Sequence, residues 1–473
     1  MNAIPLCIDL DGTLTPTDTL WELVLNMVKH KPYTALLWPA WLLRGRAYLK
    51  QRVAEHSQLD SDYLPYRTDF LEFLKTEHSA GRTLVLVTAA DKKLADKVAQ
   101  HVGIFSDVLA SDGNINLAGK NKAAELVKRF GERGFDYAGN SRTDIPVWYS
   151  ARESIVTGLA ARFVSSLPKT ITVTHVFPDK HSQVKGLIKS LRPHQWIKNI
   201  LVFIPLLLAH RMGDVNVWGQ AVIAFAALSL TASSLYVLND LLDLPSDRRH
   251  RYKKYRPLAA GHLSPLLAIL AIPLLLCIAF GLAFLLPLKF VGALVLYGLG
   301  SGIYSFYFKR IAVLDVLSLA ALFTLRIILG GFATEIPLSG WFLAFSGCIF
   351  FSGALVKRFM ELVDMPEESE HKAHGRGYTR EHLKLVNMLG MGSGYLAVTV
   401  LALYVMYSPE VDQLYSRPAR LWLLCPLLFY WITHAWRMAG RGQMHADPMT
   451  TLAKDKISYA VAVLVILVIL IST

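Results

Sequence analysis

The sequence predicts two fold classes in one chain: an α/β, Rossmann-like domain with a helical cap, then an all-α polytopic membrane bundle of about nine transmembrane helices. Two observations support this prediction. Over residues 1–186 the charges are spread along the chain and the apolar runs are short, as in a soluble domain. From about Trp196 onward, apolar stretches recur at about 20 residues, the length that spans a bilayer.

We expect the α/β domain at residues 1–165, with its cap at about 15–80, a linker with an interfacial helix at 166–195, and the membrane domain at 196–473. The linker ends in "GLIKSLRPHQWIKN", whose Lys, Arg and Trp suit a helix at headgroup level. The N-terminus "MNAIPLCIDL" lacks a basic region and is typical of a buried strand, so no signal peptide is expected. The predicted spans are roughly 196–212, 217–238, 264–287, 289–307, 311–332, 338–356, 385–407, 419–437 and 456–473.

The formal net charge of +13 is concentrated in the loops between the predicted spans. This placement favours orientation against anionic lipid and phosphate binding, and no nucleic-acid partner is expected. Most loop Lys and Arg lie in 239–263, 308–310, 357–384 and 438–455, on the side of the α/β domain. The positive-inside rule therefore predicts a multi-pass protein of the cell inner membrane, with that domain on the cytoplasmic side. The four scattered cysteines suggest neither a disulfide framework nor a metal cage.

The segment "LCIDLDGTLT" is an apolar strand followed by Asp9 and Asp11. Two carboxylates one residue apart at a strand end can divide two tasks, attack on phosphorus and acid/base catalysis. Three further segments follow in order: "TLVLVTAAD" with Thr88, "GKNKAAELVKRFG" with Lys122, and "FDYAGNSRTDIPVW". This set resembles the haloacid dehalogenase phosphatase superfamily over about residues 1–160.

The resemblance implies a role for each matching residue. Asp9 would be the nucleophile that forms an aspartyl-phosphate, and Asp11 the general acid/base. Thr88 and Lys122 would hold the phosphoryl oxygens. Lys120 is an alternative to Lys122, although the spacing to Leu126 favours Lys122.

The resemblance also implies one Mg²⁺ in this domain, held by Asp9, Asp11, Asn140 and Asp144. Asn140 departs from the family pattern, which usually has an acidic residue at that position. An Asn carbonyl can bind the metal, but one negative charge is lost from a hard-cation site. A regulatory domain without turnover therefore remains an open interpretation, as does a turn that Asp9 and Asp11 merely cap.

The stretch "YTALLWPAWLLRGRAYLK", residues 33–50, is unusually apolar for part of a cap. It can form the core of the cap. Alternatively, it can form a surface that dips into the bilayer toward a lipid substrate, since it is too short to span.

The stretch "NDLLDLPSDRRHRYKKYRPLAAGH", residues 239–262 and hereafter the Asp-rich segment, follows the second predicted span. If the helix continues through it, Asp240, Asp243 and Asp247 share one face and repel one another. A diphosphate bridged by Mg²⁺ would relieve that repulsion. The basic cluster from Arg248 to Arg256 could meet the remaining phosphate charge. A solvated, positive-inside loop would explain the basic residues but not the acidic stripe.

The pattern N-D-x-x-D-x-x-x-D with "RPLAAG" downstream and "LRPHQWIKN" upstream resembles the UbiA-type intramembrane prenyltransferases, over about residues 187–473. The resemblance implies a ring of helices with a polar pocket at the cytoplasmic end and a cleft for a polyprenyl chain. Asp240 and Asp243 would be catalytic, with Asp247 completing the ligands of a second Mg²⁺. The substrate-binding residues would be Lys198, Asn239 and Arg256.

The loop between the sixth and seventh predicted spans lacks the second D-x-x-x-D motif usual in prenyltransferases. It carries instead Lys357, Arg358, Arg376 and Tyr378, which we expect to bind substrate. Together with "LRPHQWIKN" and "LDVLSLAALFTLRIILGG", this pattern resembles the decaprenyl-phosphate phosphoribosyltransferase branch. There the donor is phosphoribosyl pyrophosphate and the acceptor a polyprenyl phosphate.

These features predict a bifunctional enzyme. The membrane half would transfer 5-phosphoribose to a polyprenyl phosphate with release of pyrophosphate, and the soluble half would remove the 5-phosphate. The alternative is a prenyltransferase acting on an aromatic or small acceptor, with a regulatory or inactive N-terminal domain. A transporter is less favoured, because an Asp-rich loop beside basic residues indicates a bound diphosphate. Asp315 and Arg326 share a face of the fifth span, where charges are costly and usually functional.

Overall fold

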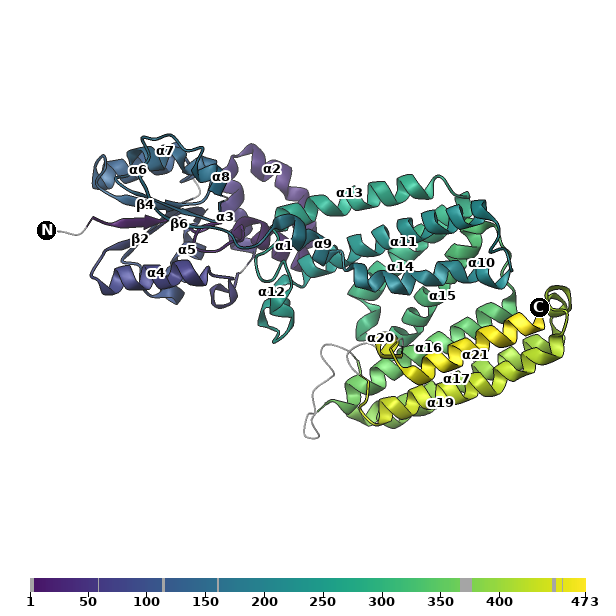
Figure 1. Cartoon of the computed structure of the whole chain (residues 1–473). Helices are drawn as coiled ribbons and strands as arrows, with labels where there is room; N and C mark the ends of the chain where they lie inside the picture. The colour runs from purple at the N-terminus through teal and green to yellow at the C-terminus, as the bar shows by residue number, and fades with distance from the viewer. Residues whose placement is uncertain are drawn as a thin grey trace. The chain divides into compact units, whose positions relative to one another are not determined.

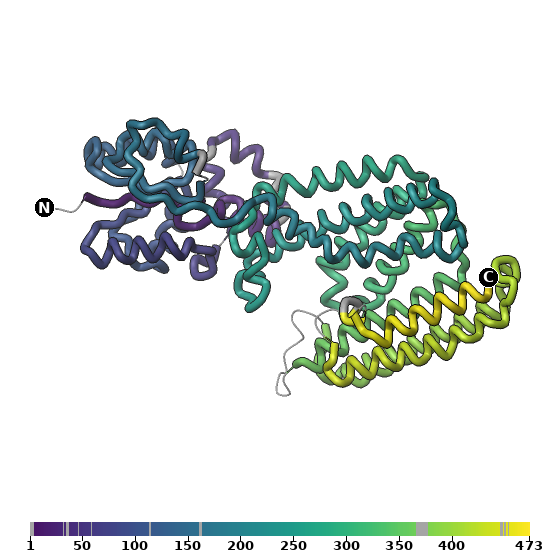
Figure 2. The backbone as a smooth tube through the Cα atoms, viewed as in Figure 1, coloured from purple at the N-terminus to yellow at the C-terminus, as the bar shows by residue number. Residues whose placement is uncertain are grey.

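The computed structural model describes residues 4–57, 59–112, 115–159, 161–365, 377–444, 448–452 and 454–473. The chain divides into two compact units (Figures 1 and 2). The first joins Met1–Pro193 with Tyr236–Leu274, and the second joins His194–Leu235 with Leu275–Thr473. The Asp-rich segment therefore belongs to the same compact unit as the α/β domain.

A six-stranded parallel sheet in the order β3-β2-β1-β4-β5-β6 forms the centre of the first unit, which confirms the predicted α/β domain. The inner strands are apolar and buried on both faces, as expected where helices cover a parallel sheet. Because β1 is central, the residue after it lies at the carboxyl edge beside the ends of β2 and β4. The strands are β1 (Leu6–Ile8), β2 (Leu84–Asp91), β3 (Asp107–Ser111), β4 (Asp136–Gly139), β5 (Ser154–Thr157) and β6 (Val173–Phe177).

Helices inserted between β1 and β2 form the region predicted as a cap. They are α1 (Thr19–His30), a 3₁₀ helix (Pro32–Leu37), α2 (Trp38–Leu43), α3 (Arg46–His56), a 3₁₀ turn (Ser61–Tyr63) and α4 (Thr68–Ser79). Asp18 caps α1 by accepting a hydrogen bond from Leu20 N. The remaining helices are α5 (Lys92–Val102), α6 (Lys120–Phe130), α7 (Ile145–Ser150), α8 (Ala161–Val164) and α9 (Gln183–Ser190).

The Asp-rich segment runs from the end of α11 (Val215–Leu242) through α12 (Leu244–Arg249) and a 3₁₀ turn (Lys253–Tyr255) to the start of α13 (Pro265–Ala283). We expected one continuous helix through Asp247. This was wrong, because the helix breaks once, at Asp243. Pro245 lies in the first turn of α12 and has no amide hydrogen to continue the helix. Backbone hydrogen bonds from Asp243 N to Asn239 O and from Asp247 N to Asp243 O keep the register nearly helical.

Six helices in the described residues are long and apolar enough to cross a membrane, so the chain is a multi-pass membrane protein. The predicted first span is instead a 3₁₀ helix (Pro193–Phe203) and α10 (Ile204–Leu208), with Pro205 at their junction. The eighth becomes a 3₁₀ helix (Pro418–Leu423) and α19 (Leu424–Gly440), and the ninth is the 17-residue α21 (Lys456–Ser472). The six are Val215–Leu242, Pro265–Ala283, Leu288–Arg310, Leu314–Thr334, Gly340–Val363 and Arg380–Tyr407.

Close helix packing in the second unit depends on glycines. A Cβ atom at Gly390 in α17 (Leu383–Tyr407) would lie 2.0 Å from the Trp436 ring, and one at Gly330 in α15 (Leu314–Thr334) would lie 2.1 Å from Val202 O. Small residues let membrane helices approach each other closely. The other helices of this unit are α14 (Leu288–Phe306), α16 (Gly340–Val363), α18 (Pro409–Leu414) and α20 (Pro448–Leu452).

Candidate functional site

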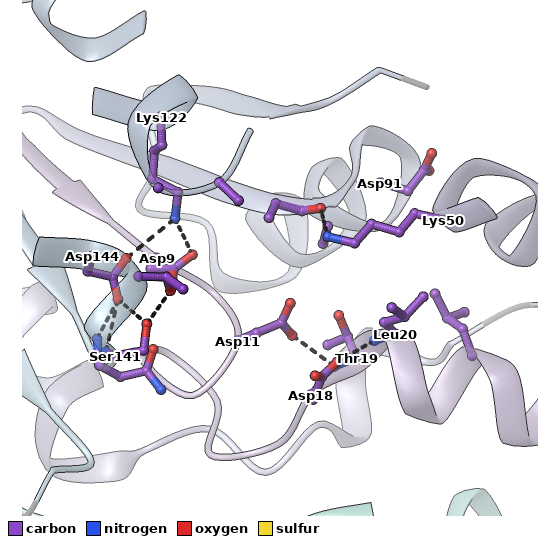
Figure 3. A pocket seen from close by; sticks show the side chains of 17 residues that line it. Asp9, Asp11, Asp18, Thr19, Leu20, Lys50, Asp91, Lys122, Ser141 and Asp144 are labelled. Atoms are coloured by element: carbon purple, nitrogen blue, oxygen red, sulfur yellow. Dashed lines mark hydrogen bonds and ion pairs between the residues drawn. The ribbon is translucent and has the colours of Figure 1, made fainter. Parts of the chain in front are cut away.

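A polar cavity of about 270 Å³ opens at the carboxyl edge of the sheet, where the chain leaves β1 (Figure 3). The carboxylates of Asp9, Asp11 and Asp144 line it together with Lys122 and Asn140. The structure therefore brings together all but one of the residues predicted for the phosphatase-like site.

Lys122 is the buried cation of this cavity. Its Nζ lies 2.8 Å from Asp9 Oδ1 and 4.0 Å from Asp144 Oδ1. It also donates to the Tyr137 hydroxyl at 2.9 Å, which in turn donates to Asp144 Oδ1. Lys120 at the start of the same helix is exposed, so the geometry favours Lys122 over Lys120 as the phosphate ligand.

Asp144 is fixed by the loop that follows β4. Its Oδ2 accepts hydrogen bonds from Asn140 N, Ser141 N and Ser141 Oγ at 2.9–3.1 Å. These bonds hold the carboxylate beside Lys122 as α7 begins, and Figure 3 shows the same arrangement.

The cavity disfavours the negatively charged forms of both Asp9 and Asp11. Burial raises the pKa of Asp9 to about 6, and Lys122 opposes the rise. Burial and then the neighbouring Asp18 raise the pKa of Asp11 to about 7, although Asp11 Oδ1 accepts a hydrogen bond from Thr19 N at 2.8 Å. A carboxyl that holds its proton near neutral pH suits the role of a general acid.

The donor set fits Mg²⁺, although among the described residues no three His, Cys, Asp or Glu side chains are grouped closely enough to hold a metal ion by themselves. Mg²⁺ commonly uses one or two carboxylates and keeps waters or substrate phosphates as its other ligands. Asp9 and Asp144 provide such carboxylates at one edge of the cavity. Gly12 (φ +75°) permits the close approach of Asn140, because a Cβ atom there would lie 1.8 Å from Asn140 Nδ2.

Two positions differ from the sequence-based expectation. Thr88 is fully buried, and its hydroxyl accepts a hydrogen bond from Ala90 N, while Ala89 and Ala90 line the cavity. Sequence reasoning missed Lys50 of α3, which also lines the cavity and donates to Ala89 O (2.8 Å) and Asn116 Oδ1 (3.1 Å). Burial lowers the pKa of Lys50. No local motif marks this lysine; only the folding of the cap brings it to the site.

The Asp-rich segment forms a second polar cluster in the first unit. Arg256 Nη1 lies 2.6 Å from Asp247 Oδ2 and 3.1 Å from Asp240 Oδ1, and Arg192 Nη2 also donates to Asp240 Oδ1. Asp240 and Asp247 are buried, and burial raises the pKa of Asp247 while Arg256 opposes the rise. Asp243 is more exposed and faces Lys29 at 3.5 Å.

Arg256 holds together two carboxylates that would otherwise repel each other, and Arg192 adds a second cation at Asp240. Such carboxylates also suit a hard divalent cation, so this donor set fits Mg²⁺ as well. Arg256 was predicted as a phosphate ligand, and here it bridges the acids. Arg192 was missed as a site residue, although it lies in the quoted "LRPHQWIKN" stretch. Asn239 is part-buried near the end of α11.

In the second unit, Arg358 is fully buried and engaged by acids. It pairs with Asp315, donates to Glu361 Oε2 at 2.7 Å and reaches the Tyr304 hydroxyl at 3.4 Å. This pairing gives the buried carboxylate of Asp315 a partner. It also neutralises the charge of Arg358, which the sequence had suggested as an accessible phosphate ligand.

The other predicted residues of the second unit make contacts of their own or lie outside the described residues. The Tyr378 hydroxyl accepts a hydrogen bond from Val313 N at 2.8 Å. Lys357 and Lys198 are part-buried, and Arg376 lies outside the described residues. Arg326 donates to Asn199 Oδ1 and to the Tyr297 hydroxyl at 3.0–3.1 Å, which fixes it among three segments.

Fold and site together define a multi-pass membrane transferase with an α/β hydrolase-like domain at its N-terminus. Residues 200–454 match the UbiA prenyltransferase family, and residues 6–148 match the haloacid dehalogenase-like hydrolases. The chain belongs to the UbiA prenyltransferase family, with a haloacid dehalogenase-like hydrolase domain fused to it.

Curated relatives share one or both parts. "Uncharacterized protein y4nM" of Sinorhizobium fredii is 35% identical over 98% of this chain and 90% of its own length. "Nodulation protein NoeC" of Azorhizobium caulinodans is 34% identical over 56% of this chain and 86% of its own. "Decaprenyl-phosphate phosphoribosyltransferase" of Corynebacterium glutamicum is 32% identical over 48% of this chain and 68% of its own length. A solved UbiA homologue from Archaeoglobus fulgidus, bound to GPP and Mg²⁺, aligns with 60% of this chain and 96% of its own at 15% identity and a TM-score of 0.46.

Proposed function

We propose that the chain is a bifunctional enzyme of the cell inner membrane. Its transferase half moves 5-phosphoribose from phosphoribosyl pyrophosphate to a polyprenyl phosphate and releases pyrophosphate. Its hydrolase half then removes the 5-phosphate from the lipid product. The observation that carries the proposal is that a diphosphate-type cluster, Asp240 with Asp247, and a phosphomonoester-type cavity, Asp9 with Lys122, belong to one compact unit.

The transferase step breaks the bond between the anomeric carbon and the diphosphate oxygen, and an oxygen of the lipid phosphate forms the new bond. Mg²⁺ held by Asp240, Asp243 and Asp247 would neutralise the diphosphate as it leaves. Arg256, which bridges Asp240 and Asp247 in this structure, and Arg192, which pairs with Asp240, would turn to the diphosphate oxygens. Relatives described as decaprenyl-phosphate phosphoribosyltransferases support the choice of donor and acceptor.

The remaining predicted substrate ligands serve the same step in the proposal. Lys198 and Asn239 would contact the substrates near the Asp-rich segment. Lys357, Arg376 and Tyr378 would supply the cationic and hydroxyl contacts for the 5-phosphate, whereas Arg358, predicted for the same role, is neutralised by Asp315 and Glu361. The proposal keeps nine membrane crossings, and it assigns both sites to the cytoplasmic side because the positive-inside rule expects the basic loops on that side.

In the hydrolase step, Asp9 attacks phosphorus, and Asp11 gives its proton to the departing ribose oxygen. Asp11 then takes a proton from the water that attacks the aspartyl-phosphate and releases inorganic phosphate. Lys122 holds the phosphoryl oxygens beside Asp9, and Thr88 would contribute a backbone or hydroxyl contact at the end of β2. Mg²⁺ bound at Asp9, Asp11, Asn140 and Asp144 would supply charge neutralisation.

Membranes that contain the full chain test both steps when they receive Mg²⁺, polyprenyl phosphate and donor labelled in the ribose. The wild type should form a label-bearing lipid without the 5-phosphate, and Asp9→Asn should accumulate the 5-phosphorylated lipid. If no lipid-soluble label forms, the transferase proposal fails. If the same membranes prenylate an aromatic acid from a prenyl diphosphate, the alternative prenyltransferase reaction is correct. If Asp9→Asn leaves the products unchanged, the hydrolase step is wrong.

A further inference from the structure

One buried ion pair joins the cap to the Asp-rich segment. Both Nη atoms of Arg248 in α12 lie 2.6 Å from the two carboxylate oxygens of Glu22 in α1, and both side chains are buried. The pair is bidentate, and its partners are 226 residues apart in sequence. Arg248 Nε also donates to Ala259 O, so the same guanidinium holds both limbs of the Asp-rich segment. Such geometry is specific and differs from a solvated surface contact.

The contact extends along one face of α1. Glu22, Leu25 and Lys29 are three and four residues apart and therefore share that face. Leu25 packs on a cluster from the Asp-rich segment that includes Leu241, Leu244 and Leu258. Lys29 donates to Leu242 O at 2.6 Å and approaches Asp243.

The rest of α1 belongs to the phosphatase-like half. Leu23, Val24 and Met27 are buried in the core of the α/β domain. The first residue of the helix, Thr19, donates its amide hydrogen to Asp11. The Thr17 hydroxyl, just before the start of the helix, donates to Glu22. One helix therefore contacts the acid/base residue of one site and the acidic segment of the other.

A second contact supports the first. Gly261, near the end of the Asp-rich segment, has φ +74°, and a Cβ atom there would lie 2.5 Å from Pro16 Cγ. Pro16 lies in the loop after Asp11 and before α1. Pro16 is thus a point of contact with the Asp-rich segment that is separate from α1.

We propose that the Glu22, Leu25 and Lys29 face of α1 is an internal docking surface that holds the Asp-rich segment in its donor-binding conformation. Glu22 is then a positioning residue of the transferase site. The α/β domain serves the transferase as a structural partner, independently of its own hydrolytic chemistry. The kinetic part of this inference rests on the proposed function, but the contact itself does not.

Charge reversal across the pair tests the proposal in the full chain. Glu22→Arg places two cations against each other, so the amides of residues 244–250 should lose protection in native-state hydrogen exchange. Because fewer molecules hold the binding-competent conformation, the KM for phosphoribosyl pyrophosphate should rise about tenfold or more, with a smaller effect on kcat. Glu22→Arg combined with Arg248→Glu should restore both readouts.

A matched control and a second variant separate this result from general misfolding. Asp60→Asn removes the exposed partner of Arg249, the neighbour of Arg248, and should leave both readouts unchanged. Gly261→Ala, which disturbs the contact with Pro16, should reproduce the loss without any change of charge. Protection of β1 and β4 serves as the folding readout in each variant.

The proposal is overturned if Glu22→Arg keeps wild-type exchange in residues 244–250, or if the double reversal fails to restore protection while β1 and β4 stay protected. If the wild type forms no phosphoribosyl lipid, the proposed function fails. The exchange measurements then still decide whether α1 holds the Asp-rich segment.

Discussion

Lys122 Nζ lies 2.8 Å from Asp9 Oδ1, and both side chains lie deep in the cavity at the end of β1. The ammonium group holds the predicted nucleophile in a fixed orientation and offsets part of its charge. We expect Lys122→Met to reduce phosphatase activity by about 100-fold or more, because a preorganised cation is removed from the phosphoryl site. Release of inorganic phosphate from a small phosphomonoester measures the effect. Lys120→Met, on the exposed side of the same helix, should retain wild-type activity and thus serves as the control.

Asn140 replaces a carboxylate that the superfamily usually provides near the metal. We expect Asn140→Asp to lower the Mg²⁺ concentration for half-maximal phosphatase activity by several-fold, because the added charge strengthens a hard-cation site. A Mg²⁺ titration of both proteins measures the shift. An unchanged midpoint would mean that residue 140 does not contact the metal.

Arg358 and Asp315 form a fully buried pair within the second unit. We expect Arg358→Met to destabilise the unit by about 3–5 kcal/mol, because it leaves the Asp315 carboxylate unpaired in an apolar setting. Adding Asp315→Leu to that variant should recover much of the loss. Thermal unfolding in detergent compares the two proteins. Equal melting temperatures for the single and double variants would argue against an ion pair of structural importance.

Two exposed leucines on the cap provide a test of whether the apolar 33–50 stretch contacts the membrane. Leu42 and Leu43 at the end of α2 are 54% and 90% exposed, whereas Trp41 beside them is buried. The stretch therefore serves as cap core and also presents an apolar surface. We expect Leu42→Glu with Leu43→Glu to slow hydrolysis of the phosphoribosyl lipid about tenfold and to spare a water-soluble phosphomonoester. Equal effects on both substrates would exclude a membrane-contacting role.

His262 gives the Asp-rich segment a sensitivity to pH. Its ring stacks on His181 at 3.5 Å between centroids, and burial followed by His181 lowers the pKa of His262. Asp179 opposes the shift, and Lys189 adds to it. The folded state therefore favours neutral His262, and stability from this contact is lost as pH falls below about 6.5. Hydrogen-exchange protection of residues 258–263 should drop between pH 7.5 and 5.5, and His262→Phe should remove that dependence.

The sequence predicted the α/β domain and most of its site well, because those residues directly follow apolar strands. Asp9 follows β1, and Asn140 follows β4. Parallel strands end at one edge, so local patterns were enough to place these side chains together. Lys50 could not be found in this way, since only the three-dimensional path of the cap brings α3 over the cavity.

In the membrane half, the helix breaks and the ion-pair partners of the charged residues were harder to predict from the sequence. Hydropathy located the long helices, and Pro205 already interrupts the first expected span in the sequence; the structure has a 3₁₀ helix and α10 there. Charge pattern identified Arg256 and Arg358 but not their acidic partners: Arg256 pairs within its own folded segment, and Arg358 pairs with Asp315 of another helix. Pro245 likewise divides the expected helix at a point that the Asp spacing alone does not reveal.

The composition of the first unit bears on how the chain is made. That unit needs Tyr236–Leu274, which the ribosome supplies only after the residues of α11 have emerged. The N-terminal sheet can therefore form early, but its partner segment arrives while the following apolar helices are entering the bilayer. Insertion of α11 and α13 and completion of the soluble fold become steps of one assembly process. A defect in inserting these two helices would then leave the exposed face of α1 without the Asp-rich segment that it contacts.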